Sequence, residues 1–472
     1  MKEQLFGREN ECRLIEKYLS SNRSEFVAVY GRRRVGKTFL LRQTLGDSLC
    51  FSFTGMANVT NMEQLQNFNL TLRQVMPEAR SVENWLEAFI ELQRYVEQCK
   101  QETKVLLFDE LPWMDTPKSN FIPAFEHFWN AWASARSDIK LFVCGSAASW
   151  MFDNVINNHG GLHNRVTHEM YLEPFTIGQC KQYFDAYHFG YNDREIAEFH
   201  MVFGGIPYYM TRMDKELSVA QNIDRLIFAP QGELRNEKEN LFRSLFRHSE
   251  DYVMIIDAIS EKGKGLTRAE ILEETGLNNN ALFGKRLEEL EKCNFIRKYK
   301  DYSDRQRQTI YQLIDPLCHF WHTVVVKNLT QDEYFWTHSQ LGPVFNTWCG
   351  FAFEMLCLNH VQQIKQALGI SGMQTNVYSW RTPSEVNPGA QIDLLIDRAD
   401  RCVNLCEMKF SRGEYEISKT ERENIEKRAL LFMQHAESRK SIRLTMVTAF
   451  GLKHNTHSSI IQNEIALADL LK

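Results

Sequence analysis

Short runs of apolar and β-branched residues, each ended by polar residues, recur along the first third of the chain. Residues 26–30, Phe-Val-Ala-Val-Tyr, have the length and composition of a buried strand. Residues 105–108 and 141–144 repeat that character, and residues 39–42 continue with helical character. The pattern predicts buried strands alternating with helical sequence in this part of the chain.

The hydrophobic pattern changes after a charged stretch over residues 231–240. Short helices are predicted next, and a Thr-x-x-Glu capping box at residues 267–270 opens one of them. Residues 295–296 and 310–311 can then pair as two strands around a turn at residues 301–304. This order is typical of a winged-helix module. The three predicted helices cover residues 252–259, 267–276 and 281–292.

The last part of the chain mixes helices with strands. Residues 351–358 form an apolar helical stretch, and residues 390–396 and 403–410 read as two strands joined by a turn. A basic helix near residues 419–428 precedes another strand over residues 442–449. The pattern predicts a second region in which helices and strands alternate.

Composition limits the class of protein. The 472 residues predict roughly two to four folded units. The net charge of −5 means that any contact with nucleic acid must come from a local patch. No apolar run approaches the roughly 18 residues that a membrane span needs. The 11 cysteines contain no CxxC pair and read as reduced thiols. We therefore expect a soluble, cytoplasmic protein.

The first predicted strand runs directly into a glycine-bearing loop over residues 31–38, Gly-Arg-Arg-Arg-Val-Gly-Lys-Thr. This is a complete GxxxxGK[ST] sequence between a strand and a helix, although a chance match in a turn would look the same. Main-chain N–H groups of such a loop surround phosphate oxygens. Lys37 is expected to reach the β- and γ-phosphates, and Thr38 to ligate Mg²⁺. The predicted nucleotide-binding residues are Gly31, Arg32, Arg33, Arg34, Val35, Gly36, Lys37 and Thr38.

Further polar residues stand where the next predicted strands end. Asp109 is expected to hold Mg²⁺, and Glu110 to act as the general base toward an attacking water. Ser146 either contacts the γ-phosphate or the lytic water, or caps the following helix. Arg165 is either an arginine finger or sensor, or an ordinary surface arginine. The predicted catalytic residues of this site are Lys37, Glu110, Ser146 and Arg165.

These residues, with Gly7-Arg8-Glu9 and the Gly-Gly-Ile-Pro segment at 204–207, resemble the archaeal-type P-loop ATPases, a branch near the AAA+ and STAND ATPases. The resemblance covers roughly residues 1–240. It implies a doubly wound parallel sheet with a helical lid, and ATP and Mg²⁺ as cofactors. In that family residues 7–9 pack near the nucleotide base, and the glycine pair lies in the lid.

Four polar residues stand among the apolar stretches near the end of the chain. Glu407 and Lys409 are two apart on one strand and project from the same face, and a hairpin can bring Asp393 beside them. With Glu354, they resemble the PD-(D/E)xK nuclease core, although Ile392 stands where proline is usual. The other reading is a solvated ion pair.

That resemblance implies a role for each of these residues. Asp393 and Glu407 would hold divalent cations beside a scissile phosphate, and Glu354 would be an outer metal ligand. Lys409 would stabilise developing charge or the attacking water. The predicted metal ligands of the whole chain are Thr38, Asp109, Glu354, Asp393 and Glu407.

The expected fold class is α/β, with four domains. Residues 1–170 are predicted to form the P-loop ATPase core and residues 171–240 the helical lid. Residues 241–315 are predicted to form the winged helix, and residues 316–472 the α/β restriction-endonuclease-like domain.

Two functions fit these expectations. The first is an ATP-hydrolysing protein that couples nucleotide turnover to a DNA-directed, nuclease-like module. The second is a STAND-like nucleotide switch whose C-terminal domain is not catalytic. DNA contact by the winged helix and a purely structural role are weighed equally. An arginine finger acting across subunits would imply a homo-oligomer, and no membrane partner is expected. The basic residues of the winged helix are Lys285, Arg286, Arg297, Lys298 and Lys300.

Overall fold

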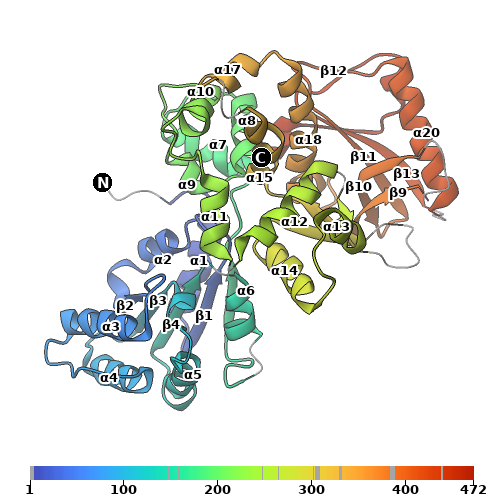
Figure 1. Ribbon diagram of the computed structural model, residues 1–472. Coiled ribbons are helices and arrows are strands. Elements are labelled where there is room, and N and C mark those ends of the chain that lie inside the picture. Colours follow the sequence, from blue (N-terminus) through green and yellow to red (C-terminus); the bar gives the residue numbers. More distant parts are fainter. Residues whose placement is uncertain are drawn as a thin grey trace. The chain divides into compact units, whose positions relative to one another are not determined.

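The computed structural model in Figure 1 divides into two compact units, Met1–Pro174 and Phe175–Lys472. We describe each unit by itself. The structure describes residues 5–146, 148–157, 160–246, 248–263, 265–300, 302, 309–328, 332–382, 389–436 and 440–472. Within these ranges, no helix is both long enough and apolar enough to cross a membrane.

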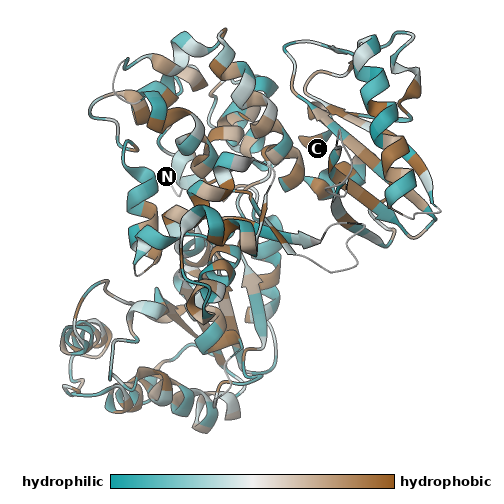
Figure 2. Ribbon diagram, turned by 45° about the vertical axis from the view of Figure 1, so that its right-hand side comes forward, coloured by the Kyte–Doolittle hydropathy of each residue, from teal (hydrophilic) through white to brown (hydrophobic). Residues whose placement is uncertain are grey.

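The first unit is built on a five-stranded sheet in which every pair is parallel, in the order β2-β3-β4-β1-β5. Strands β1, β3 and β4 are buried along their whole length, which confirms the three strands predicted from apolar runs. Figure 2 shows these strands as largely hydrophobic. The strands are β1 (Glu25–Tyr30), β2 (Leu49–Thr54), β3 (Lys104–Asp109), β4 (Ile139–Gly145) and β5 (His168–Tyr171).

Helices connect these parallel strands, as a parallel sheet requires. Thr60 and Asn84 cap two of them by accepting hydrogen bonds from main-chain N–H groups. Phe89 of α4 stacks on Phe128 of α5, and both rings are buried. The helices are α1 (Glu9–Leu19), α2 (Lys37–Leu45), α3 (Asn61–Val75), α4 (Trp85–Gln98), α5 (Phe121–Ala131) and the short α6 (Ala148–Met151).

The second unit begins with helices. A helix break lies at Gly204-Gly205, between α8 and α9, and both glycines have φ near +68°. A Cβ on Gly205 would lie 2.0 Å from the carbonyl oxygen of Phe175, so only glycine fits there. The helices are α7 (Ile177–Ala186), α8 (Asp193–Phe203), α9 (Pro207–Met210), α10 (Val219–Ile223) and α11 (Glu237–Leu245).

Three helices and a small antiparallel sheet of order β6-β8-β7 follow. The capping box at Thr267 opens α13, as predicted, and the helix ends at Gly276 in a left-handed conformation. Most of the predicted turn at 301–304 lies outside the described residues. The elements are α12 (Ser249–Lys262), β6 (Leu266–Thr267), α13 (Arg268–Thr275), α14 (Ala281–Lys292), β7 (Ile296–Lys300) and β8 (Thr309–Leu313).

Further helices then pack against the start of the unit. The indole N–H of Trp336 donates to Glu198 of α8 at 2.7 Å, and both residues are buried. The helices after residue 315 therefore share a core with α8, and the segments predicted as three domains after residue 170 fall in one compact unit. These helices are α15 (Pro316–Phe320), α16 (Val326–Asn328), α17 (Phe335–Ser339), α18 (Pro343–Asn359) and α19 (Val361–Ala367).

The chain ends in a mixed five-stranded sheet of order β15-β13-β11-β10-β9. Leu395, Leu405 and Phe432 join one apolar cluster, which packs α20 against the sheet. A two-stranded ribbon, β12 (Tyr415–Glu416) with β14 (Leu452–Lys453), flanks it. The remaining elements are β9 (Thr375–Arg381), β10 (Gln391–Arg398), β11 (Cys402–Lys409), α20 (Lys419–His435), β13 (Ser441–Thr448), β15 (Asn463–Ala466) and α21 (Leu467–Leu470).

Candidate functional site

The strand order of the first sheet brings three chain segments together at the carboxyl ends of its strands. Strands β3, β4 and β1 are neighbours and parallel, so their carboxyl ends lie side by side. The loop 31–38 follows β1, Asp109 ends β3, and Ser146 follows β4. Ligands of open parallel sheets bind at such an edge. The topology therefore brings together the polar residues that the sequence placed at separate strand ends.

Backbone conformation in the loop depends on its two glycines. Gly36 has φ +90° and precedes the first turn of α2. Gly31 has φ +149°, and a Cβ there would lie 2.4 Å from the carbonyl oxygen of Leu172. The loop therefore takes a path that other residues would block. Arg32 is buried, whereas Arg33 and Arg34 are half-buried.

Lys37 lies inside the loop rather than in solvent. Its side chain is 5% exposed, and its ammonium donates to the carbonyl oxygens of Gly31 and Arg32, both at 2.9 Å. Burying an ammonium is costly unless acceptors surround it. The loop thus holds a positive charge at the place where the sequence predicts phosphate oxygens.

Thr38 and Asp109 form a pair of oxygen ligands. The Thr38 hydroxyl donates to Asp109 Oδ1 at 3.0 Å, and the Asp109 side chain is buried. The Cys144 thiol also donates to Asp109 Oδ1, at 2.6 Å, and burial together with the Asp109 charge raises the pKa of that thiol. A hydroxyl and a carboxylate in contact are donors of the kind that Mg²⁺ prefers. These two residues therefore fit the predicted Mg²⁺ site.

Glu110 has an unusual backbone conformation. Its φ of +52° is left-handed, which is uncommon for a residue with a Cβ. The Ser146 hydroxyl donates to Glu110 Oε2 at 3.0 Å, and the Ser146 N–H lies 3.4 Å from the same oxygen. The structure thus joins two residues that the sequence predicted separately. This contact was not predicted, because it depends on the neighbouring positions of β3 and β4.

Arg165 does not join this group. It is exposed in the turn before β5, and its N–H donates to the Leu162 carbonyl oxygen at 3.0 Å. No contact from Arg165 to Lys37 or Glu110 is present among the residues that the structure describes. The geometry therefore does not support a role for Arg165 in the nucleotide site of its own chain. A role of Arg165 in the site of another subunit stays a prediction.

Arg8 is buried between the segment before α1 and the phosphate loop. The side chain is 4% exposed and donates to the carbonyl oxygens of Val35, at 3.3 Å, and Glu173, at 2.7 Å. Burial lowers the pKa of its guanidinium, and Glu11 opposes that effect. Arg8 therefore ties the segment before α1 to the phosphate loop.

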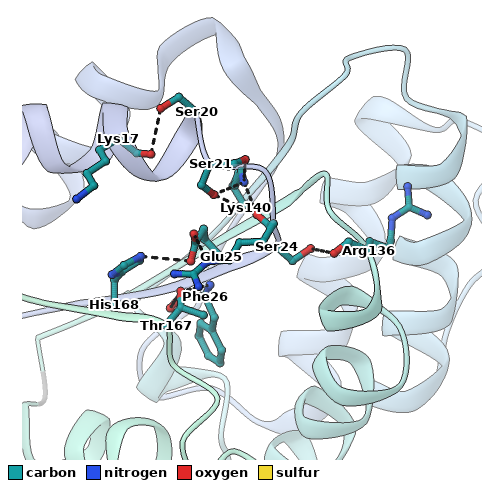
Figure 3. A network of polar contacts seen from close by, with 11 residues as sticks. Lys17, Ser20, Ser21, Ser24, Glu25, Phe26, Arg136, Lys140, Thr167 and His168 are labelled. Atoms are coloured by element: carbon teal, nitrogen blue, oxygen red, sulfur yellow. Dashed lines mark hydrogen bonds and ion pairs between the residues drawn. The ribbon is translucent and has the colours of Figure 1, made fainter.

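Another polar network lies at the amino ends of the strands of the same sheet, as Figure 3 shows. Glu25 is 1% exposed, accepts a hydrogen bond from Arg23 Nε at 2.9 Å and pairs with His168 at 3.3 Å. Lys140 donates to the carbonyl and hydroxyl oxygens of Ser21, both at 2.8 Å. These contacts fasten the segment before β1 to β4 and β5, and the hydrophobic pattern did not predict them.

The second unit contains a cavity of about 550 Å³ beside the mixed sheet. Glu354 of α18, Asp393 of β10, and Glu407 and Lys409 of β11 all line it, although 55 residues separate the first of them from the last. Helix α20 supplies the facing wall. Its cavity-lining side chains are Glu421, Asn424, Lys427, Arg428 and Leu431.

Glu407 is held between two cations. Lys409 Nζ lies 2.7 Å from Oε1, which confirms that the two side chains project from the same face of β11, and Arg428 Nη1 lies 3.0 Å from Oε2. Burial lowers the pKa of Lys409, but the charge of Glu407, the hydrogen bond with Glu407 and the charge of Glu354 together outweigh burial, so that the pKa is raised overall. The sequence predicted the first pair and missed Arg428, which lies on another element.

Glu354 is a buried carboxyl in this cavity. Burial raises its pKa to about 7, and the nearby Asp393 and Glu407 act in the same direction, while Lys409 opposes them. Asp393 accepts a hydrogen bond from the Gln391 side chain. Three carboxyl groups, from Glu354, Asp393 and Glu407, therefore line the same cavity.

A metal cluster is not formed by these residues as they stand. Among the residues that the structure describes, no group of three or more His, Cys, Asp or Glu side chains is close enough to hold one ion. The carboxylates fit a divalent cation in chemistry, but they are not gathered around one point. The metal-ligand set therefore stays a prediction.

The basic residues predicted on the winged-helix module are mostly engaged. Arg286 pairs with Asp251, and Lys298 pairs with Glu291 at 2.7 Å. Arg297 donates to Gln312 at 3.0 Å, and burial lowers its pKa to about 10. Lys285 is exposed, and the side chain of Lys300 lies outside the described residues. Among the described side chains, three of the five predicted basic residues are therefore engaged by protein groups, and Lys285 is exposed.

The geometry of the first unit agrees with a comparison by sequence. Residues 5–213 match the model of a family described as an ATPase domain predominantly from Archaea. Over these residues the chain is similar to archaeal-type ATPase domains. The match runs beyond the sheet of the first unit through α9 and ends at residue 213.

Relatives of the whole chain are distant. An uncharacterised protein of Methanocaldococcus jannaschii is 24% identical over 352 residues, which is 74% of this chain and 75% of that protein. A Walker-type ATPase of Pyrococcus abyssi has a TM-score of 0.47 at 19% identity, over 68% of this chain and 96% of the other. The ORC2 protein of Aeropyrum pernix has a TM-score of 0.41 at 15% identity, over 69% of this chain and 94% of the other.

Proposed function

We propose that the ATPase domain binds ATP and Mg²⁺ at the loop 31–38 and hydrolyses the nucleotide there. The observation that carries this proposal is the contact of Thr38 with Asp109 beside the contact of Ser146 with Glu110. Thr38 and Asp109 would hold Mg²⁺, which neutralises charge on the phosphates when bound. The other steps of hydrolysis are assigned to Lys37, Glu110 and Ser146.

Lys37 supplies the fixed positive charge. Its ammonium exchanges the Gly31 and Arg32 carbonyl oxygens for phosphate oxygens, because an anionic acceptor makes the stronger hydrogen bond. Glu110 accepts the proton of the attacking water, and Ser146 holds the carboxylate in its orientation. The left-handed backbone of Glu110 is consistent with a functional position, where such strain is often found.

We propose in addition that the cavity beside the mixed sheet is a nuclease-like centre directed to DNA. Its floor carries Asp393, Glu407 and Glu354, which would hold a divalent cation that supplies Lewis-acid chemistry when bound. Its wall carries the exposed Lys427, a cation suited to a phosphodiester backbone, while Arg428 is paired with Glu407. We expect DNA to be contacted through this cavity.

A second candidate function is favoured by the state of Glu407. Both of its oxygens are paired with cations, and the described residues hold no cluster of metal-binding side chains. In a nucleotide switch with a non-catalytic C-terminal region, Glu407 would act as a structural ion-pair centre. This candidate predicts slow turnover, tight nucleotide retention and no cleavage that depends on a divalent cation.

One experiment with the full chain separates these functions. ATP hydrolysis is measured beside cleavage of plasmid and single-stranded DNA with Mg²⁺ or Mn²⁺. Lys37→Ala should abolish hydrolysis, and Lys409→Ala should abolish cleavage while hydrolysis continues. Lys453→Ala is the matched control, because Lys453 forms an exposed pair with Glu416 at 2.9 Å outside the cavity. ATP hydrolysis without any DNA cleavage by the wild type would leave the switch as the function.

A further inference from the structure

Two cysteines of the first unit meet at the outer edge of its sheet. Cys50 lies at the start of β2, the edge strand, and Cys99 directly follows α4. Their sulfur atoms are 2.6 Å apart, although 49 positions separate the residues in sequence. Neither residue takes part in the nucleotide site or in the cavity of the second unit. The functions proposed above therefore leave this pair without a role.

Neighbouring side chains fix the backbone at both cysteines. The Tyr95 hydroxyl donates to the Cys50 carbonyl oxygen at 3.0 Å, and the Lys104 ammonium donates to the Cys99 carbonyl oxygen at 2.7 Å. Lys104 is itself buried and also donates to the Gln101 carbonyl oxygen. Hydrogen bonds hold the backbone of β2 at Cys50 and the backbone after α4 at Cys99. The fold therefore keeps the two sulfur atoms in contact, and they are not two mobile surface thiols.

The two thiols differ in their surroundings. Cys50 is 5% exposed, and burial raises the pKa of its thiol to about 12. Cys99 is partly exposed and reachable from solvent. An oxidant would therefore reach Cys99 first, and Cys50 would remain as a protonated thiol beside it.

We propose that Cys50 and Cys99 are a thiol pair that a peroxide-class oxidant converts to an intramolecular disulfide. The Cys99 sulfur attacks one peroxide oxygen, the O–O bond breaks, and a sulfenic acid and one water form. The Cys50 sulfur then attacks the Cys99 sulfur, the S–O bond breaks, and the departing hydroxide takes the Cys50 proton as a second water. Two thiols are oxidised, one peroxide is reduced, and a dithiol reductant reverses the change.

The cross-link would close a long loop that contains α3 and α4. Closing such a loop restricts the unfolded chain more than the folded one, because the folded sulfur atoms are already in contact. The oxidised protein should therefore show a higher midpoint of thermal unfolding in the absence of reductant. The shift should vanish when a dithiol is added.

The test uses the full chain, treated with hydrogen peroxide, alkylated and digested with trypsin. Cleavage after Arg42, Arg73, Arg94 and Lys100 releases Cys50 in residues 43–73 and Cys99 in residues 95–100. The proposal expects these two peptides as one linked species, about 2 Da lighter than their sum since two hydrogens are lost. Reduction should restore both peptides and their alkylation.

Cysteine variants test whether Cys50 and Cys99 are the residues that form the disulfide. Cys50→Ser and Cys99→Ser should each remove the linked peptide and the shift in unfolding midpoint. Cys12→Ser is the matched control, because Cys12 is also partly exposed but its sulfur faces the Thr44 hydroxyl at 3.8 Å. Cys12→Ser should leave both signals intact. Recovery of Cys99 as a sulfinic acid with Cys50 still alkylated, or a link to another cysteine or another chain, would overturn the proposal.

Discussion

At the scale of single residues, the nucleotide site is a set of contacts between the ends of different strands. Ser146 reaches Glu110, and Thr38 reaches Asp109. Local sequence identified each of these residues, because a phosphate loop and an apolar strand ending in acids are short patterns. Their pairing could not be predicted locally, since it depends on β3, β4 and β1 being neighbours in the sheet.

Glu110→Gln should leave ATP binding nearly unchanged and lower kcat by about 10²–10⁴-fold, because the amide cannot accept a proton from water. Single-turnover hydrolysis and calorimetry with ATP measure the two effects separately. Ser146→Ala should lower kcat less, since the base remains but loses the donor that orients it. Equal loss of binding and of turnover in Glu110→Gln would show that Glu110 holds the fold of the site and is not its base.

Gly31→Ala should weaken both folding and nucleotide binding. The added methyl group would lie 2.4 Å from the Leu172 carbonyl oxygen, which is main chain and cannot turn aside. We expect a loss of about 1–3 kcal/mol in the free energy of unfolding, typical of backbone incompatibility. Gly372→Ala is the comparison, because Gly372 is not left-handed and its Cβ would meet no heavy atom within 4 Å. Equal stability of Gly31→Ala and wild type in urea would contradict the geometry.

At the scale of elements, helices supply the partners that strand patterns could not reveal. Helix α20 places Arg428 against Glu407 of β11, and the segment before α1 places Arg8 against the phosphate loop. Strands β2 and β9 were not predicted, because Leu49–Thr54 and Thr375–Arg381 mix polar and apolar residues without a clear buried run. Pattern therefore found the central strands and missed β2 and β9, which form one edge of each sheet.

Arg428→Ala should tighten the binding of Mn²⁺ at the cavity about fivefold. The guanidinium lies 3.0 Å from Glu407 and competes with a cation for the same oxygen, and a partly exposed pair is worth about 1 kcal/mol. Calorimetric titration of the full chain with Mn²⁺ measures the change. Arg422→Ala, on the same helix and paired with Glu426 at 3.0 Å, should leave it unchanged. Weaker Mn²⁺ binding in Arg428→Ala would mean that the arginine orients Glu407 for the metal.

The Glu25 network at the amino ends of the strands in the first sheet should make the free energy of unfolding depend on pH. Burial would raise the pKa of Glu25, but hydrogen bonds with Thr167, Arg23 and Ser21, together with the charge of His168, outweigh burial and lower the pKa below the usual 4.5. The unfolded chain then binds the proton more readily, so that the contribution is full above pH 4.5 and is lost as pH falls toward the folded pKa. Glu25→Gln should flatten this part of a urea-unfolding profile against pH. The exposed Glu16→Gln should not.

At the scale of the whole molecule, the chain folds as two compact units, Met1–Pro174 and Phe175–Lys472. Composition predicted more than one unit, and the strand-loop-helix pattern located the first. The later boundaries were not readable, because side chains far apart in sequence, such as Trp336 and Glu198, share one core. Alternating patterns report which residues are buried, but not which elements bury them together.

ATP with Mg²⁺ should therefore move only one of two unfolding transitions in scanning calorimetry. A ligand stabilises the unit that binds it, by about 2.7 kcal/mol when its concentration is 100 times Kd. Lys37→Ala should abolish the shift and leave the other transition where it was. A single transition that moves as a whole would show that the two units unfold cooperatively.

The carbonyl oxygens that accept hydrogen bonds from Lys37 affect which anions the loop can bind. An arriving anion does not enter a ready receptor, because it must first displace two acceptors that already satisfy the ammonium. Orthophosphate offers the oxygens of a single phosphorus centre, whereas a polyphosphate can replace both acceptors and at the same time accept hydrogen bonds from main-chain N–H groups along the loop. The loop should thus discriminate against orthophosphate, so that abundant free phosphate does not compete for the site.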